Sequence, residues 1–190
     1  NTLEKMPLDS APDDSPLPPE ANGNGNGNGN NGASAADYTS DKFKKLSDRD
    51  HVRERYGMYI GDSSVQGLHH LVYELVNNSI DEAMAGFATL IIVTINNDGS
   101  VSVEDDGRGI PVEKHEQMSA EKGRDVSTLE AAMTNLNMGA KFDKQSYKTS
   151  GGLHGIGLKA VNFLSRWCEA TICRNGAMYQ QEFEAGVPLG

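Results

Sequence analysis

The chain has 190 residues, of which 37% are hydrophobic, and its formal net charge is −10 at pH 7. That length is sufficient for one domain with a hydrophobic core. The acidic balance makes direct binding of duplex DNA a poor interpretation, because such binding depends on lysine and arginine at the phosphates. No apolar run approaches the roughly 20 residues that span a bilayer, and we recognise no signal peptide. We therefore expect a soluble, cytoplasmic protein without a membrane partner.

Residues 1–36 differ in composition from the rest of the chain. They hold five of the seven prolines and an Asn/Gly repeat that runs from Asn22 to Gly32. A segment of this kind cannot bury enough apolar surface to offset the conformational entropy lost on ordering. We therefore predict that residues 1–36 are a disordered, low-complexity extension and that residues 37–190 form a single domain.

A helix over residues 69–86 is the clearest element of that domain. Its apolar side chains recur three and four positions apart. Glu74, Asn77, Asn78 and Asp81 fall at the same spacing on another face, so their side chains line one stripe. A solvated helix surface is one interpretation of this stripe. The stripe has acids and amides but no lysine or arginine, which suits a metal ion, a phosphate or a catalytic water better than bulk solvent.

Two β-rich runs, residues 90–95 and 100–105, flank a glycine-containing turn at 97–99. This pattern predicts a β-hairpin. In the second run, Asp105 follows two valines on the same face of the strand. An acid therefore continues an apolar, core-facing row, which indicates a buried acceptor that awaits a donor.

The remaining elements follow from the same local signals. The sequence predicts a short helix over 47–55 capped by Ser47 or Asp48, a loop at 106–111, a mobile surface segment at 112–127, a helix at 128–138, a polar loop at 139–150, a glycine-rich turn at 151–157 that opens a helix, and strands at 167–173 and 178–183 around a turn at Arg174-Asn175-Gly176. Cys168 and Cys173 are an odd number of positions apart in one strand, so we expect neither a disulfide nor a metal pair.

The glycine-rich turn at 151–157 has a chemical interpretation of its own. A glycine-rich turn at a helix start exposes several main-chain N–H groups beside the positive end of the helix dipole, which makes an anion site. A plain tight turn is the alternative. The segment lacks the Gly-Lys-Ser/Thr ending of a P-loop, and no strand precedes it as in a dinucleotide fold.

In combination, these features resemble one family. The acid/amide helix, a strand ending in Asp-Asp-Gly-x-Gly and a glycine-rich helix start occur in the order seen in the N-terminal ATPase domain of bacterial type II topoisomerases, most closely the gyrase B subunit and its topoisomerase IV counterpart. That domain belongs to the GHKL (Bergerat-fold) ATPases, with histidine kinases, mismatch-repair ATPases and the ninety-kilodalton heat-shock chaperones. The resemblance covers residues 38–190 and rests on the helix 69–86, Gly57-Met58-Tyr59-Ile60-Gly61-Asp62, Asp105 to Pro111, Gly139 to Tyr147 and Ser150-Gly151-Gly152-Leu153-His154-Gly155-Ile156-Gly157.

The resemblance implies roles for the matching residues of the reaction centre. Glu74 would be the general base that activates water for attack on the γ-phosphate of ATP. His70, one helical turn earlier, would hold the Glu74 carboxylate in place. Asn78 would ligate Mg²⁺. Asp105 would accept a hydrogen bond from the adenine amino group.

The resemblance implies further nucleotide contacts. Gly109 would lie behind the adenine, Lys141 and the amides of 153–157 would hold the phosphates, and Tyr147 would reach the adenine. Arg174 matches the arginine beside the pocket where aminocoumarin inhibitors bind. For Asp81 and Glu82 a structural salt bridge, in the case of Glu82 with Arg108, stays open beside ligand contact. The further residues that the resemblance implies for nucleotide binding are Asp81, Glu82, Arg108, Gly109, Ile110, Pro111, Lys141, Tyr147, Gly152, Leu153, His154, Gly155, Ile156, Gly157 and Arg174.

The chain departs from the family pattern at three places. Tyr56 stands where the family usually has proline, Ala140 replaces a common glycine, and residues 113–126 are longer than the usual connection. The family's downstream transducer domain does not occur in these 190 residues. We therefore expect the chain to bind ATP but to hydrolyse it slowly or not at all.

The resemblance implies an α+β fold, a two-layer sandwich with helices on one face of a mixed, mostly antiparallel sheet. It implies an ATP-dependent homodimer in which the segment near Tyr38 serves as an exchanging arm, and contacts to the gyrase A subunit and DNA outside these residues. Two other classes stay open. A histidine kinase would need a phospho-acceptor helix upstream, and a non-catalytic nucleotide sensor would not need Glu74.

Overall fold

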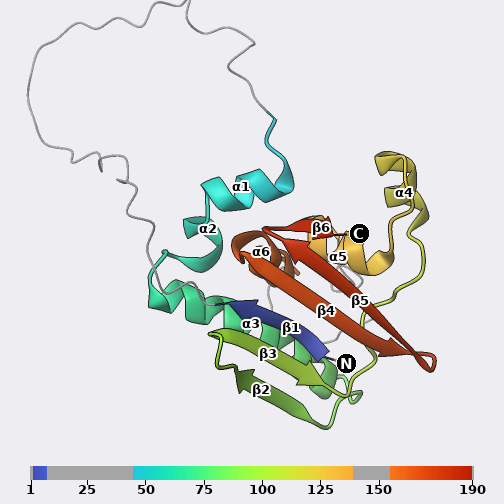
Figure 1. Cartoon of the computed structure of the whole chain (residues 1–190), viewed down its shortest axis with the longest axis horizontal. Helices are drawn as coiled ribbons and strands as arrows, with labels where there is room; N and C mark the ends of the chain where they lie inside the picture. Colours follow the sequence, from blue (N-terminus) through green and yellow to red (C-terminus); the bar gives the residue numbers. More distant parts are fainter. Residues whose placement is uncertain (1, 8–44, 139–154, 190) are drawn as a thin grey trace, which may run out of the picture.

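A six-stranded sheet runs through the protein, with its strands in the order β2-β3-β1-β4-β5-β6. The computed structural model describes residues 2–7, 45–138 and 155–189. Every pairing between the described strands is antiparallel, and α3 and α6 lie together on one face of the sheet (Figure 1). The two-layer α+β class is therefore confirmed. The strands are β1 (Thr2–Pro7), β2 (Ile91–Ile95), β3 (Ser100–Asp105), β4 (Trp167–Arg174), β5 (Ala177–Glu184) and β6 (Val187–Leu189); the helices are α1 (Asp48–Glu54), α2 (Gly57–Ile60), α3 (Val65–Met84), α4 (Glu116–Lys122), α5 (Thr128–Thr134) and α6 (Gly157–Leu164).

Strand β1 corrects the expectation that all of residues 1–36 are disordered. Thr2–Pro7 pair with β3 on one side and with β4 on the other, so they lie in the middle of the sheet. Main-chain groups make this pairing, and residues 2–6 contain neither proline nor glycine. Composition averaged over 36 residues hides such a short segment. Residues 8–36 lie outside the described part.

Helix α3 is the longest helix and is buried along one side. Ser64 caps it by accepting a hydrogen bond from the Gln66 N–H at 3.2 Å, so the helix begins four residues earlier than its apolar pattern indicates. Leu71 and Leu75 are almost fully buried and pack with Phe163 of α6 and Val103 of β3. This cluster joins the helical layer to the sheet.

Helix α1 is attached to the rest of the domain by side chains that reach main-chain groups. The Asp48 carboxylate accepts from a main-chain N–H, and Arg49 and Arg53 each donate to a main-chain carbonyl. Their partners are Leu136 at 2.8 Å, Ala185 at 2.6 Å and Phe163 at 2.8 Å respectively. Ser47 is the N-cap, as predicted.

Both predicted hairpins are present. In the first, Ile91 to Ile95 pair with Asp105 to Val101. In the second, β4 and β5 pair along their whole length around Asn175 and Gly176, whose φ angles of 55° and 76° are those of an Asn-Gly hairpin turn. Cys168 is buried and Cys173 is exposed, as expected for opposite faces of a strand, and neither forms a disulfide.

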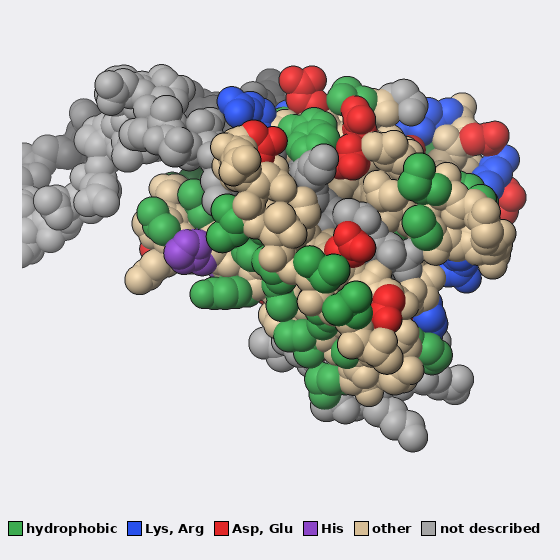
Figure 2. Space-filling model, turned by 60° about the horizontal axis from the view of Figure 1, so that its bottom comes forward, with side chains coloured by type: hydrophobic (Ala, Val, Ile, Leu, Met, Phe, Trp, Pro, Cys, Tyr) green, Lys and Arg blue, Asp and Glu red, His purple; other side chains and the backbone are tan. Residues whose placement is uncertain are grey.

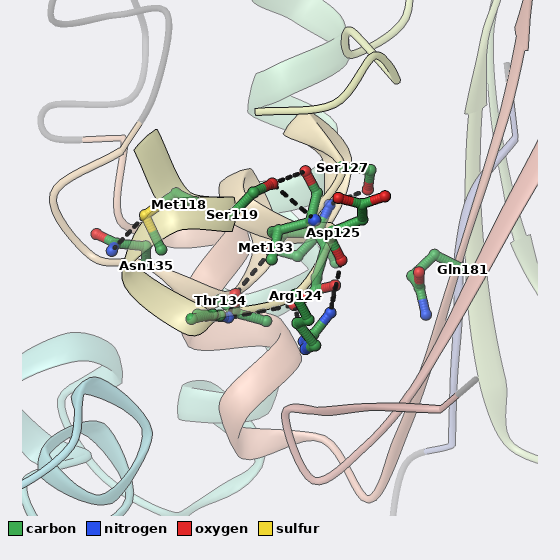
Figure 3. Close-up of polar contacts among 12 residues, drawn as sticks. Met118, Ser119, Arg124, Asp125, Ser127, Met133, Thr134, Asn135 and Gln181 are labelled. Atoms are coloured by element: carbon green, nitrogen blue, oxygen red, sulfur yellow. Dashed lines mark hydrogen bonds and ion pairs between the residues drawn. The ribbon is translucent and has the colours of Figure 1, made fainter. Parts of the chain in front are cut away.

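The segment 112–127 is an ordered part of the domain, not the mobile surface segment that its charge predicts. It contains α4 and a bridge between Lys114 and Ser127, and its Met118 and Val126 side chains pack on α5. The buried Glu130 carboxylate accepts hydrogen bonds from Arg124 and from Lys122. Figure 3 shows Arg124 with these contacts and, close by, Ser119, which bonds to the Val126 main chain. The segment is ordered because buried apolar residues stand between its charged ones.

One side of the molecule exposes apolar side chains. They concentrate on the edge strand β2 and the adjoining end of α3, the side that is turned forward in Figure 2. The exposed residues there include Ile80, Met84, Phe87, Leu90, Ile92, Val93 and Ile95. Among the residues that the structure describes, no helix is both long enough and apolar enough to cross a membrane.

Candidate functional site

The polar stripe of α3 faces the start of α6. The His70 Nε2 atom lies 3.4 Å from Glu74 Oε1, one helical turn apart. The Glu74 side chain is 22% exposed, so one part of the carboxylate meets solvent and another part meets protein. A partly exposed carboxylate held by an imidazole is suited to take a proton from a water molecule.

Gly157, the first residue of α6, lies directly against Glu74. A Cβ atom at this position would be 1.8 Å from Glu74 Oε2 and 2.6 Å from Glu74 Cδ. Only glycine therefore allows the carboxylate to reach the helix start. No side chain of the described residues caps α6, so its first N–H groups are available to an anion there. A candidate base and a candidate anion site thus share one place.

Asn78 lies one turn after Glu74 on the same stripe. Its Nδ2 atom donates to the Glu74 main-chain carbonyl at 2.9 Å, which fixes the plane of the amide. The amide oxygen is the atom that could ligate a cation. No group of three or more His, Cys, Asp or Glu side chains among the described residues could hold a metal ion. Nucleotide-bound Mg²⁺ keeps several waters and needs only one or two protein ligands, which a single amide fits.

Asp105 ends strand β3 and is 4% exposed, as the core-facing row Val101, Val103, Asp105 predicts. Its Oδ2 accepts from the Ser79 hydroxyl at 2.8 Å, and its Oδ1 accepts from the Gly107 N–H at 2.9 Å. The two hydrogen bonds fix the carboxylate in the plane where its remaining lone pairs can accept from a ligand. A buried acceptor of this kind suits an amino group of a flat base.

Two residues of this arrangement escape sequence reasoning. Ser79 is one of many helix residues without a distinct pattern, and it becomes recognisable only when α3 is placed against β3. Gly107 has a signal, because it follows two acids in a loop. A Cβ atom there would be 2.8 Å from Asp105 Oδ1 and 3.1 Å from the Glu82 Cβ. Glycine is thus required by the approach of α3 to the loop.

The loop after β3 is clamped to α3 by Arg108. Its guanidinium donates to both Glu82 oxygens at 2.8 and 3.0 Å, and its main-chain N–H donates to Oε2 at 3.2 Å. The same guanidinium lies 3.6 Å above the ring of Phe87. The predicted Glu82–Arg108 pair is therefore confirmed. Phe87 is a further partner that spacing alone does not reveal.

Asp106 has a structural part beside the site. Its carboxylate accepts from the Thr89 hydroxyl and N–H at 2.6 Å each and from the Leu90 N–H at 2.9 Å. The Thr89 hydroxyl bond is the main cause that lowers the pKa of Asp106 to about 2, with the two main-chain N–H groups adding to it. The ionised carboxylate thus joins the ends of β2 and β3 across neutral pH.

The other predicted residues lie at different places in the structure. Asp81 is 1% exposed, so its side chain lies inside the protein. Arg174 reaches the loop that follows β3, where its Nη1 donates to the Gly109 carbonyl at a long 3.4 Å. Ile110 packs against the core between α5 and β4. The predicted contacts that lie outside the described residues are Lys141, Tyr147, Gly152, Leu153 and His154.

The structure therefore brings together the residues at two ends of one surface. Glu74, His70, Asn78 and the start of α6 form one end, and Asp105 with the Arg108 loop forms the other. Both ends are held by α3, because His70, Glu74, Asn78, Ser79 and Glu82 all lie on it. The Asp105 carboxylate of β3 contacts Ser79, and the start of α6 contacts Glu74, so both lie against α3, which itself carries the Asn78 amide.

Comparisons with known proteins identify the family of this chain. Residues 63–185 match the sequence profile described as "Histidine kinase-, DNA gyrase B-, and HSP90-like ATPase". The chain is 59% identical over 138 residues to the DNA gyrase B subunit of Chlamydia muridarum, covering 73% of this chain and 17% of that protein. It is 55% identical over 154 residues to the DNA gyrase B subunit of Caulobacter vibrioides, covering 80% of this chain and 18% of that protein. It thus spans less than a fifth of the length of these two curated relatives.

A solved structure shows the same fold. The crystal structure of the 43K ATPase domain of Thermus thermophilus gyrase B in complex with an aminocoumarin matches with a TM-score of 0.61 and 37% sequence identity. The match covers 75% of this chain and 33% of that one. The chain therefore belongs to the family of histidine kinase-, DNA gyrase B- and HSP90-like ATPases.

Proposed function

We propose that the chain is the ATP-binding and ATP-hydrolysing domain of a DNA gyrase B subunit. The observation that supports the proposal is the contact between Glu74 and Gly157, because a carboxylate that could act as a general base lies against a helix start that could hold phosphates. The likeness to gyrase B subunits of several bacteria supports gyrase over topoisomerase IV and over a histidine kinase or a nucleotide sensor.

At the phosphate end, Glu74 takes a proton from a water molecule as the water oxygen attacks the γ-phosphorus of ATP. His70 keeps the Glu74 carboxylate oriented, and ADP leaves as the bond to the bridging oxygen breaks. The N–H groups at the start of α6 bind the phosphate oxygens. Asn78 would hold Mg²⁺, which when bound neutralises charge on the phosphates.

At the base end, Asp105 accepts a hydrogen bond from the adenine amino group. Ser79 and Gly107 hold the carboxylate for that contact. Gly109 and Pro111 border the base, and the Glu82–Arg108 pair keeps this loop against α3. Lys141, Tyr147 and residues 152–154 complete the nucleotide contacts in this proposal.

In the whole protein, ATP binding would join two copies of this domain and drive DNA strand passage and supercoiling in the cytoplasm. The gyrase A subunit and the DNA would bind to other parts of the protein, in keeping with the acidic balance of this chain. The structural relative holds an aminocoumarin. We propose that this chain binds the same class of inhibitor, with Arg174 at the border of its pocket.

Calorimetric titration with the non-hydrolysable analogue AMPPNP and Mg²⁺ tests the proposal. We expect one nucleotide per chain for the wild type and loss of binding for Asp105→Asn, which keeps the shape of the side chain but loses half of its acceptors. Asp125→Asn is the matched control, because the Asp125 side chain is exposed and its described ion pair is with Lys114, away from Asp105. No binding by a wild-type sample whose circular dichroism is that of a folded protein would contradict the proposal.

A further inference from the structure

Lys159 is a buried lysine that the proposed mechanism does not use. It lies in the first turn of α6 and is 3% exposed. Its Nζ atom donates hydrogen bonds to the main-chain carbonyls of Met138 and Gly155. These two residues are 17 positions apart, and Gly155 stands two residues before the glycine that meets Glu74. The ammonium group therefore lies beside the helix start.

Two features of this position favour an anion close to the ammonium group. Removal of an ammonium group from water is costly, and main-chain carbonyls accept its hydrogen bonds but carry no net charge to neutralise it. In addition, the first turn of a helix carries the positive end of the helix dipole, which repels a cation. An anion at the same place lowers both costs. Glu74 supplies one negative charge there, against Gly157.

We propose that Lys159 is a positioning residue for the phosphates of the nucleotide. Its ammonium attracts them through space, without touching them, and its two hydrogen bonds hold the Met138 and Gly155 main chain in the geometry that presents the first N–H groups of α6. The inference rests on the proposed function, because it places the phosphates of ATP at this helix start. It adds a residue whose charge distinguishes a nucleotide from a nucleoside.

The test compares a phosphorylated ligand with an unphosphorylated one. The dissociation constants of Mg²⁺·AMPPNP and of adenosine are measured for wild type, K159M and K159R. Methionine keeps the length of the chain and removes the charge, whereas arginine keeps the charge. We expect K159M to bind AMPPNP about tenfold more weakly, as for one buried charge at short range, and adenosine as tightly as wild type. K159R should keep most of the AMPPNP affinity.

The outcomes are separable. Equal loss of adenosine and AMPPNP affinity in K159M would mean a purely structural role and overturn the inference while the proposed function stands. Unchanged AMPPNP affinity in K159M would overturn it as well. A folded wild type that binds neither ligand would overturn the proposed function and this inference with it.

A second measurement covers the case in which K159M does not fold. In wild-type protein labelled with ¹⁵N-lysine, the Nζ resonance of Lys159 is identified by its absence from K159R. We expect this resonance to shift on addition of AMPPNP with Mg²⁺ and to stay in place on addition of adenosine. The same response to both ligands would overturn the inference.

Discussion

Gly157 shows how one absent side chain positions a reactive group. In Gly157→Ala the new Cβ would meet Glu74 Oε2 at 1.8 Å and Cδ at 2.6 Å, so the carboxylate must leave its place. We expect the free energy of unfolding to fall by about 1–3 kcal/mol, the range for overpacking, and AMPPNP binding to weaken. Urea denaturation and calorimetry measure the two effects.

Gly57→Ala is the matched control for this substitution. No atom lies within 4 Å of a Cβ built at Gly57, and the residue is helical. Its free energy of unfolding should therefore change by less than about 1 kcal/mol, because alanine is the better helix former. Equal losses for the two variants would show that the contact with Glu74 is not the cause.

Ser79 supports Asp105 through one buried hydrogen bond. Ser79→Ala removes the hydroxyl that donates to Asp105 Oδ2 at 2.8 Å. A hydrogen bond to a charged group contributes about 1.5–3 kcal/mol, so we expect lower stability together with weaker AMPPNP binding. Ser119→Ala is the control, because it removes a buried hydroxyl of α4 that bonds to the Val126 main chain. It should lower stability only. Nucleotide affinity that stays at the wild-type value in Ser79→Ala would contradict the role given to Ser79.

At the scale of single residues, the sequence predicts which face a side chain occupies where that face depends on local periodicity. The burial of Asp105 follows from its alternation with Val101 and Val103, because a strand repeats every two residues. The stripe with Glu74 and Asn78 follows in the same way from helical spacing. Ser79 and Phe87 could not be predicted, because their roles depend on how α3 lies across the sheet and the following loop.

At the scale of elements, α4 and α5 are joined by the ion pairs of Glu130. Arg124 Nη2 lies 2.5 Å and Lys122 Nζ 3.2 Å from Glu130 Oε1. Burial by itself would raise the pKa of the Glu130 carboxyl, but the hydrogen bonds from Arg124 and Lys122 outweigh burial and hold the pKa below its usual value of 4.5. Ionised Glu130 therefore stabilises the folded state.

The sign of this effect gives a pH dependence. A carboxyl whose pKa is lower in the folded state contributes its stability in full above the unfolded pKa and loses it as pH falls through the folded pKa. We expect Glu130→Gln to lower the free energy of unfolding by about 1–3 kcal/mol at pH 7, and the difference from wild type to shrink below about pH 4.5. Urea denaturation at several pH values measures it. A difference that is constant from pH 7 to pH 3 would exclude the ion pairs as the cause.

Elements with strong local signals are predictable, and those that depend on distant partners are not. The Asn-Gly turn at 175–176 and the Ser47 cap identify β4–β5 and α1 directly. Helix α4 could not be predicted from the charged segment 112–127, because only Met118 and Val126 indicate that one side of this segment is buried. Strand β1 has no local signal, since its hydrogen-bond partners lie about 100 residues away in β3 and further away in β4.

At the scale of the whole molecule, β2 is an edge strand whose side chains stay mostly exposed beside the largely buried side chains of β3. Ile95 and Val101 are cross-strand partners, yet Ile95 is 77% exposed and Val101 is 2% exposed. We expect Ile95→Lys to change the free energy of unfolding by less than about 0.5 kcal/mol, and Val101→Lys to prevent folding, because a buried unpaired ammonium costs several kcal/mol. Circular dichroism with urea denaturation distinguishes the two. Unfolding of Ile95→Lys would mean that this end of β2 is covered.

The contacts of α1 have a consequence for how the chain is made. Its three side chains bond to partners 88, 136 and 110 residues further along the sequence. At a translation rate of roughly 5–20 residues per second, the last of these partners leaves the peptidyl transferase centre about 7–27 s after α1. During that interval the ribosome carries an α1 that cannot dock fully, so the domain completes its fold only after β5 and the turn that follows it have been made.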